Sequence, residues 1–178
     1  MGEQHKKHNR REHLNDFHLN VAGEYVYDGA LYACQNDDAK QRRSKRAVWG
    51  MAAILTVAVA AGGCIPAPGM QNCFYVLLPY LGEFLGAASV IWALAKLGMD
   101  WGTVREYNYK KSVAVLPVRT AVTAVFSLLG IVCELIFFFV NDHAGQTFFA
   151  LLYVLLKLIA LLSVLVLRAE IMQAEWDK

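Results

Sequence analysis

Four long apolar segments occupy most of the chain, and they constrain its fold more than any other feature. They cover roughly residues 47–65, 73–98, 112–140 and 147–168. Each is long enough to cross a bilayer, because a transmembrane helix needs about 20 apolar residues. A chain of 178 residues has too little polar surface to cover four such segments in water. We therefore predict an all-α integral membrane protein with a four-transmembrane-helix bundle over residues 47–168.

The composition supports this prediction and excludes several other classes of protein. Hydrophobic residues make up 57% of the chain and charged residues 18%, whereas soluble domains have about 45–50% apolar and about 25% charged residues. A soluble globular domain, a disordered chain and a disulfide-rich secreted scaffold are therefore excluded. The formal net charge of +2 gives no reason to expect a nucleic acid as partner.

The lysine and arginine residues predict how the bundle is oriented. The connections 66–72 and 141–146 contain none, whereas 99–111 contains three and the arm before residue 47 contains nine. Basic residues concentrate in cytoplasmic loops. We therefore expect both termini in the cytoplasm and the protein in the cell membrane, with residues 169–178 as a cytoplasmic tail. The short outer connections predict that segments one and two, and segments three and four, pair as tight antiparallel hairpins.

The N-terminal arm, residues 1–46, is expected to have three parts. The helix of the first apolar segment should begin early, with Asn36 or Asp37 as its N-cap. The basic cluster from Lys40 to Arg46 attracts anionic headgroups, and its simplest role is to fix the orientation of the chain. The predicted parts are a disordered stretch at 1–16, a short cytoplasmic β-hairpin at 24–34 and a basic helix start at 37–46.

The predicted hairpin depends on the pair Asp28-Gly29, which lies between two short runs of apolar and tyrosine residues. Asp-Gly is a strong hairpin signal because both residues adopt positive φ readily. With this pair as the turn, Tyr25 would face Tyr32. A two-stranded hairpin is marginally stable alone in water, so we expect it to pack against an apolar surface.

Ionisable residues inside the apolar segments are the main anomaly of the sequence. Glu83 and Lys157 each lie ten residues from the outer end of their segment, or about 15 Å, near the midplane of a bilayer. Glu134 lies about 9 Å below the outer end of the third segment, and Arg119 about 10 Å from its inner end. Because charges at this depth are costly, we predict that Lys157 pairs inside the bundle with Glu83 or Glu134.

Two interpretations of these four residues remain open. Arg119 and Glu134 lie with Thr123, Ser127 and Gly130 within one arc of about 80° on the third helix, so a polar face should point into the bundle. This intramembrane cluster is either a transport path or binding site, or a set of buried pairs that fixes helix register. The two acids and two bases balance, which favours internal pairing.

The small residues and cysteines also leave alternatives open. Gly82 and Gly86 form a Gly-x-x-x-Gly pattern, which allows close helix packing either within the bundle or between two copies of the chain. Cys64 and Cys73 flank the first outer connection. They are either joined by a disulfide or present as two separate thiols.

No catalytic, phosphate-binding or metal-binding motif occurs in the sequence. We therefore expect no enzymatic activity, no cofactor and no bound metal. The short outer loops, the tyrosine-rich hairpin and the balanced internal charges favour a non-enzymatic accessory or interaction subunit of a membrane assembly. The alternative is a small ion-coupled transporter or carrier that uses the intramembrane charges. Either would have the lipid bilayer as a partner, in a homo-oligomer or a larger membrane complex.

Overall fold

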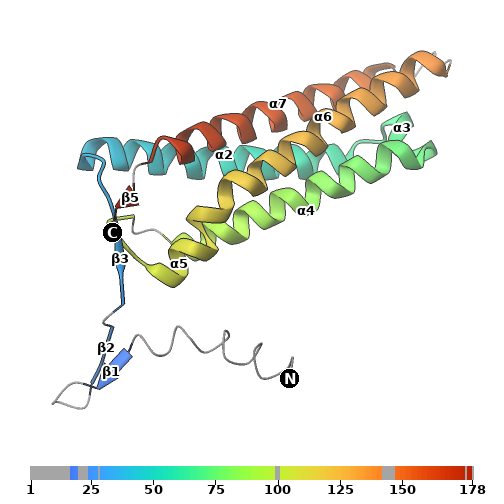
Figure 1. The fold of residues 1–178 in the computed structure, drawn as a ribbon. Coiled ribbons are helices and arrows are strands. Elements are labelled where there is room, and N and C mark those ends of the chain that lie inside the picture. The colour runs from blue at the N-terminus through green and yellow to red at the C-terminus, as the bar shows by residue number, and fades with distance from the viewer. Residues whose placement is uncertain are drawn as a thin grey trace, which may run out of the picture.

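The chain folds into a mostly helical structure built around four long helices (Figure 1). The computed structural model describes residues 17–19, 24–27, 29–98, 101–141, 147–174 and 176–177. All four helices are long and apolar enough to cross a membrane. Their bounds agree with the predicted segments to within a few residues, except that the first helix begins earlier. They are α2 (Asp38–Cys64), α4 (Phe74–Leu97), α6 (Leu116–Val140) and α7 (Thr147–Met172).

The early start of α2 follows the predicted helix start at residues 37–46. Asp37 is its N-cap, although the Asp37 side chain makes no capping hydrogen bond. From there the helix passes without a break from the basic cluster into the first apolar segment. The basic residues are therefore carried on a rigid helix that is continuous with the bundle.

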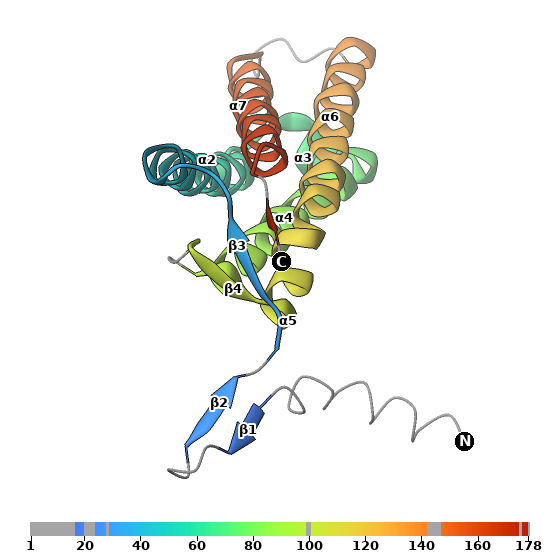
Figure 2. The same ribbon diagram turned by 60° about the vertical axis from the view of Figure 1, so that its left-hand side comes forward.

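The packing order of the helices differs from the predicted pair of hairpins. Helix α2 packs mainly along α7, α7 packs along α6, and α6 along α4, whereas α2 and α4 meet over a smaller area (Figure 2). The prediction that the first two segments form a tight hairpin is therefore wrong. A short helix, α3 (Pro68–Asn72), occupies the connection between them and packs on α6 and α7 as well as α4. It separates the ends of α2 and α4.

The bundle has an apolar surface and a polar interior. Large apolar side chains are exposed along all four helices, among them Val57 on α2, Leu85 on α4, Val125 on α6 and Leu162 on α7. Several polar or charged side chains are instead fully buried. They are Glu83, Ser112, Thr120, Thr123, Ser127 and Glu134. This distribution is the reverse of the one that favours solubility in water.

A small sheet lies at the end of the bundle opposite α3. Strand β3 (Leu31–Cys34) pairs antiparallel with β4 (Thr103–Arg105) on one side and with β5 (Trp176–Asp177) on the other. The ring of Tyr32 stacks on that of Tyr109 in α5 (Glu106–Lys111), with centroids 4.1 Å apart. This sheet end of the bundle therefore joins the arm, the connection between α4 and α6, and the C-terminal segment.

The predicted hairpin at residues 24–34 does not form, and this prediction is wrong. Strand β2 (Tyr25–Tyr27) pairs instead with β1 (Phe17–Leu19), so Tyr25 lies opposite Leu19. Tyr32 lies opposite Val104. Strand β3 gains hydrogen bonds on both edges by pairing with β4 and β5, which an isolated hairpin cannot offer. Asp28 and the predicted disordered stretch 1–16 lie outside the described residues.

Candidate functional site

A buried ion pair lies in the middle of the bundle and joins two of its helices. Lys157 on α7 pairs through Nζ with Glu83 Oε2 on α4, and the two side chains are 2% and 0% exposed. Ser127 on α6 donates a hydrogen bond from Oγ to the other oxygen, Glu83 Oε1. The predicted pairing of Lys157 with one of two carboxylates is confirmed, and Glu83 is the partner. Both oxygens of the Glu83 carboxylate are thus bonded.

Two tyrosine rings flank the ammonium group of Lys157. Its Nζ lies 4.7 Å from the ring centroid of Tyr80 and 5.2 Å from that of Tyr153. Both rings are placed by helix geometry, because Tyr153 lies four residues before Lys157 and Tyr80 three residues before Glu83. A cation near an aromatic face is stabilised by about 2 kcal/mol or more where water is absent. The rings therefore offset part of the cost of burying the charge.

The backbone of α6 approaches the lysine closely at Gly130. A Cβ at this position would lie 3.5 Å from Lys157 Cε and Nζ, in van der Waals contact with the lysine. The ion pair also connects indirectly to α2, because Tyr80 donates a hydrogen bond from its hydroxyl to the carbonyl oxygen of Val59 at 3.4 Å. All four long helices therefore contribute to the surroundings of the pair.

The second carboxylate, Glu134, is buried against the backbone of Gly69 in α3. It is 0% exposed, and no side chain among the described residues donates a hydrogen bond to either of its oxygens. Its Oε2 lies against Gly69 of α3, where a Cβ would overlap it. The hydroxyl of Tyr153 is also buried without a partner in the described part of the chain. The charge balance favours internal pairing, but among the described residues Glu134 forms no ion pair.

Arg119 lies away from the ion pair and has a different partner. Its Nη1 donates to the carbonyl oxygen of Ser89 on α4 at 2.6 Å, and its side chain is half-buried. The other predicted members of the α6 face, from Thr123 to Glu134, are fully buried. The polar face therefore points into the bundle as predicted, and Arg119 forms its edge, nearer the sheet end.

The paired glycines of α4 pack against α6 of the same chain. A Cβ at Gly82 would lie 2.5 Å from the ring of Phe126, and one at Gly86 would lie 2.5 Å from Thr123 Oγ1. These contacts leave no space for a side chain at either position. Of the two interpretations of the Gly-x-x-x-Gly pattern, the structure therefore favours packing within the bundle.

The cysteines and the candidate metal ligands do not assemble into a site in the described part of the chain. Cys64 and Cys73, which flank α3, are both free thiols. Cys34 and Cys133 are free thiols as well. No group of three or more potential metal ligands occurs among the residues that were placed.

Tyr80 is the member of this site that the sequence analysis missed. Its spacing of three residues from Glu83 was the available signal, because such residues share a helix face. Comparison with known proteins adds no further guide to the site. No family model, no curated protein and no solved structure matches the chain.

Proposed function

We propose that the chain is an integral membrane protein that crosses the cell membrane four times, with the sheet end of the bundle in the cytoplasm. The apolar surface of the four long helices supports the membrane location. The orientation is supported by the basic residues of 40–46 and 105–111, which lie at the sheet end, whereas the connections at the α3 end contain none. In this placement both termini are cytoplasmic.

Cysteine labelling tests the orientation. In a variant whose four native cysteines are replaced by serine, Gln71→Cys is expected to react with a membrane-impermeant maleimide added outside the cell. Thr103→Cys is expected to react only after the membrane is permeabilised. Both side chains are exposed, whereas Gly69 has no room for a cysteine. Outside labelling at Thr103→Cys would overturn the orientation.

We propose further that the protein is a non-enzymatic accessory subunit of a membrane assembly. The observation that carries this proposal is the closed ion pair, in which both oxygens of Glu83 are bonded and the Lys157 ammonium lies between two rings. Such a pair fixes the register of helices in a bundle. Its two charges compensate each other, so the pair presents no net charge to a substrate.

The two-stranded sheet of the arm supports an interaction role. Strands β1 and β2 lie apart from the helices in both views (Figures 1 and 2). On β2 the side chains of Tyr25 and Val26 are 74% and 48% exposed. A two-stranded sheet of this size gains stability when a third strand or an apolar surface completes it.

Affinity purification in a mild detergent tests the accessory role. We expect the full chain, purified from its native membrane, to carry a partner protein in a fixed ratio. The double variant Tyr25→Ser/Val26→Ser should lose most of that partner because it removes the exposed contacts of β2. Glu24→Ser, in the same exposed segment, is the matched control and should retain it. A chain that purifies alone would contradict the proposal.

A small ion-coupled carrier is the second candidate, and one observation favours it. Glu134 and the Tyr153 hydroxyl are buried polar groups that have no side-chain hydrogen-bond partner among the described residues, on the α3 side of the ion pair. Buried polar groups normally find partners, and an intramembrane carboxylate is a common proton-binding group in carriers. Glu134 would bind the coupling proton in this mechanism, and Lys157 would respond to its charge.

Proton flux into vesicles distinguishes the two candidates. If the chain is a carrier, vesicles that contain it should dissipate an imposed pH gradient faster than empty vesicles, as measured with an entrapped pH-sensitive dye. Glu134→Gln should then lower the rate at least about tenfold, while Glu24→Gln on the exposed arm leaves it unchanged. Wild-type vesicles that behave like empty ones would exclude the carrier.

A further inference from the structure

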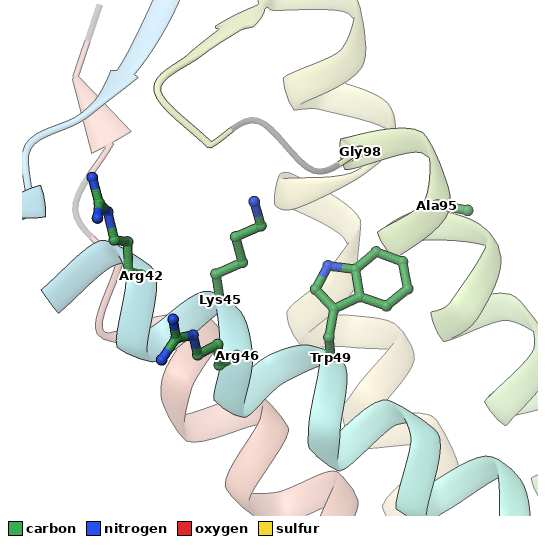
Figure 3. A pocket seen from close by; sticks show the side chains of 6 residues that line it. All are labelled: Arg42, Lys45, Arg46, Trp49, Ala95 and Gly98. Carbon is green, nitrogen blue, oxygen red and sulfur yellow. The ribbon is translucent and has the colours of Figure 1, made fainter. Parts of the chain in front are cut away.

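A basic pocket opens between α2 and the end of α4, away from the buried ion pair. Its volume is about 780 Å³, within the usual range of small-molecule sites. The pocket lies where α2 and α4 have separated, since these two helices meet over a smaller area than the other neighbours. Its lining residues are Arg42, Lys45, Arg46, Trp49, Ala95 and Gly98 (Figure 3).

The cations of the pocket share one side of α2. Arg42, Lys45 and Arg46 have offsets of 0, 3 and 4, and Trp49 follows three residues later, so all four lie on one helix face. In Figure 3 the side chains of Lys45 and Trp49 extend from α2 towards the end of α4. Among the described residues none of the three cations has an ion-pair partner. Three cations that form no ion pair within the described part of the chain thus line one opening.

Trp49 adds a hydrogen-bond donor without a partner. Its indole Nε1 is buried and finds no acceptor among the residues that the structure places. A buried indole N–H usually has an acceptor, so an acceptor from a ligand would complete it. At the opposite wall α4 ends at Leu97 and is followed by its C-cap Gly98, whose φ of 73° suits glycine. A Cβ at Gly98 would meet no atom within 4 Å. Because Gly98 has no side chain, nothing at this position closes the pocket.

The position of the pocket along α2 indicates the kind of ligand. Arg42, Lys45 and Arg46 belong to the basic start of the helix, whereas the apolar segment begins at residue 47. In the membrane placement proposed above, the pocket therefore lies at the cytoplasmic headgroup level, where tryptophan is enriched. Basic pockets between transmembrane helices on this side bind phosphate-bearing lipid headgroups.

We propose that this pocket is a binding site for the phosphate of an anionic phospholipid headgroup. Arg42, Lys45 and Arg46 neutralise the phosphate, and the Trp49 indole donates to one of its oxygens. The mixed lining suits an amphipathic ligand, because Trp49 and Ala95 provide apolar contacts beside the cations. The proposal rests on the proposed membrane placement, and it is independent of whether the protein is an accessory subunit or a carrier.

The thermal stability of the full chain in a neutral detergent tests the site. Short-chain phosphatidylglycerol is expected to raise Tm in a saturable way, and short-chain phosphatidylcholine at the same concentration is not. The double variant Lys45→Gln/Arg46→Gln should weaken the apparent Kd for phosphatidylglycerol about thirtyfold. The control Lys40→Gln/Arg43→Gln makes the same change of residue types on the same helix and should leave the Kd within about twofold.

Additional experiments distinguish a lipid phosphate from a soluble phosphate, and a failure of the pocket proposal from a failure of the membrane placement. Trp49→Phe keeps the ring and removes the donor, so it should weaken phosphatidylglycerol binding by about fivefold. Inorganic phosphate that raises Tm at equal concentration would assign the pocket to a soluble phosphate compound and overturn the lipid. Equal loss in both double variants would indicate diffuse attraction and also overturn the site. If labelling confirms the membrane orientation but no lipid preference appears, the pocket proposal fails alone.

Discussion

Lys157→Met should lower the stability of the bundle by about 3–5 kcal/mol, the typical effect of removing one partner from a buried ion pair. The substitution leaves the Glu83 carboxylate, 0% exposed, with Ser127 as its remaining hydrogen-bond donor. An unpaired charge in the middle of a membrane costs at least about 2.5–3.5 kcal/mol. The measurement is unfolding of the purified protein in detergent, by Tm and by denaturant, compared with the wild type.

Removing both charges should lower the stability of the bundle less than removing one of them. Lys157→Met/Glu83→Gln should recover part of the lost stability, since no uncompensated charge remains. Lys157→Met/Glu134→Gln should recover little, because Glu134 is not the ionic partner. Leu158→Met is the matched control, as this neighbouring side chain is exposed, and it should be nearly neutral. A silent Lys157→Met would contradict the role assigned to the pair.

The same variants separate the two candidate functions. If the ion pair only fixes how α4 and α7 pack, the double variant should regain partner binding together with stability. If the protein is a carrier, the double variant should regain stability while proton flux remains lost, since flux would require the charge of Lys157. Comparing stability with either activity in one variant set therefore assigns the pair to a structural or a functional role.

The four long helices could be predicted because their signal is local. An apolar segment of 20 or more residues specifies a membrane-crossing helix almost independently of the rest of the chain. The pairing of β3 could not be predicted, because its partners β4 and β5 come much later in the sequence. A turn signal such as Asp28-Gly29 specifies only a neighbouring partner, and tertiary pairing overrode it.

The sequence predicted which residues belong to the site better than it predicted which partners they contact. Depth along each helix placed Glu83 and Glu134 within reach of Lys157, but the choice between them depends on how the helices rotate. The position of helix α3 also influences which carboxylate pairs with Lys157, since Gly69 lies against the Glu134 carboxylate. The partner of Arg119 is a backbone oxygen of Ser89, and backbone acceptors carry no sequence signal.

Gly86→Ala should disrupt the packing of α4 on α6, with a loss of about 1–3 kcal/mol in the free energy of unfolding. The added Cβ would lie 2.5 Å from Thr123 Oγ1 and 3.3 Å from the Thr123 Cα. Because the second contact is with backbone, a side-chain rotation cannot relieve it, and α4 must move away from α6. That movement would also separate Glu83 from Ser127.

A second substitution tests whether this contact is the cause. Thr123→Ala in the Gly86→Ala background should restore part of the stability, because it removes the oxygen that the new methyl meets first. Ala88→Val adds more volume on the exposed face of the same helix and should change stability by less than about 0.5 kcal/mol. Independent, additive losses from Gly86→Ala and Thr123→Ala would mean that the two positions do not meet, because residues in contact show coupling energies. The close packing of α4 on α6, and with it the placement of Glu83 beside Ser127, would then be wrong.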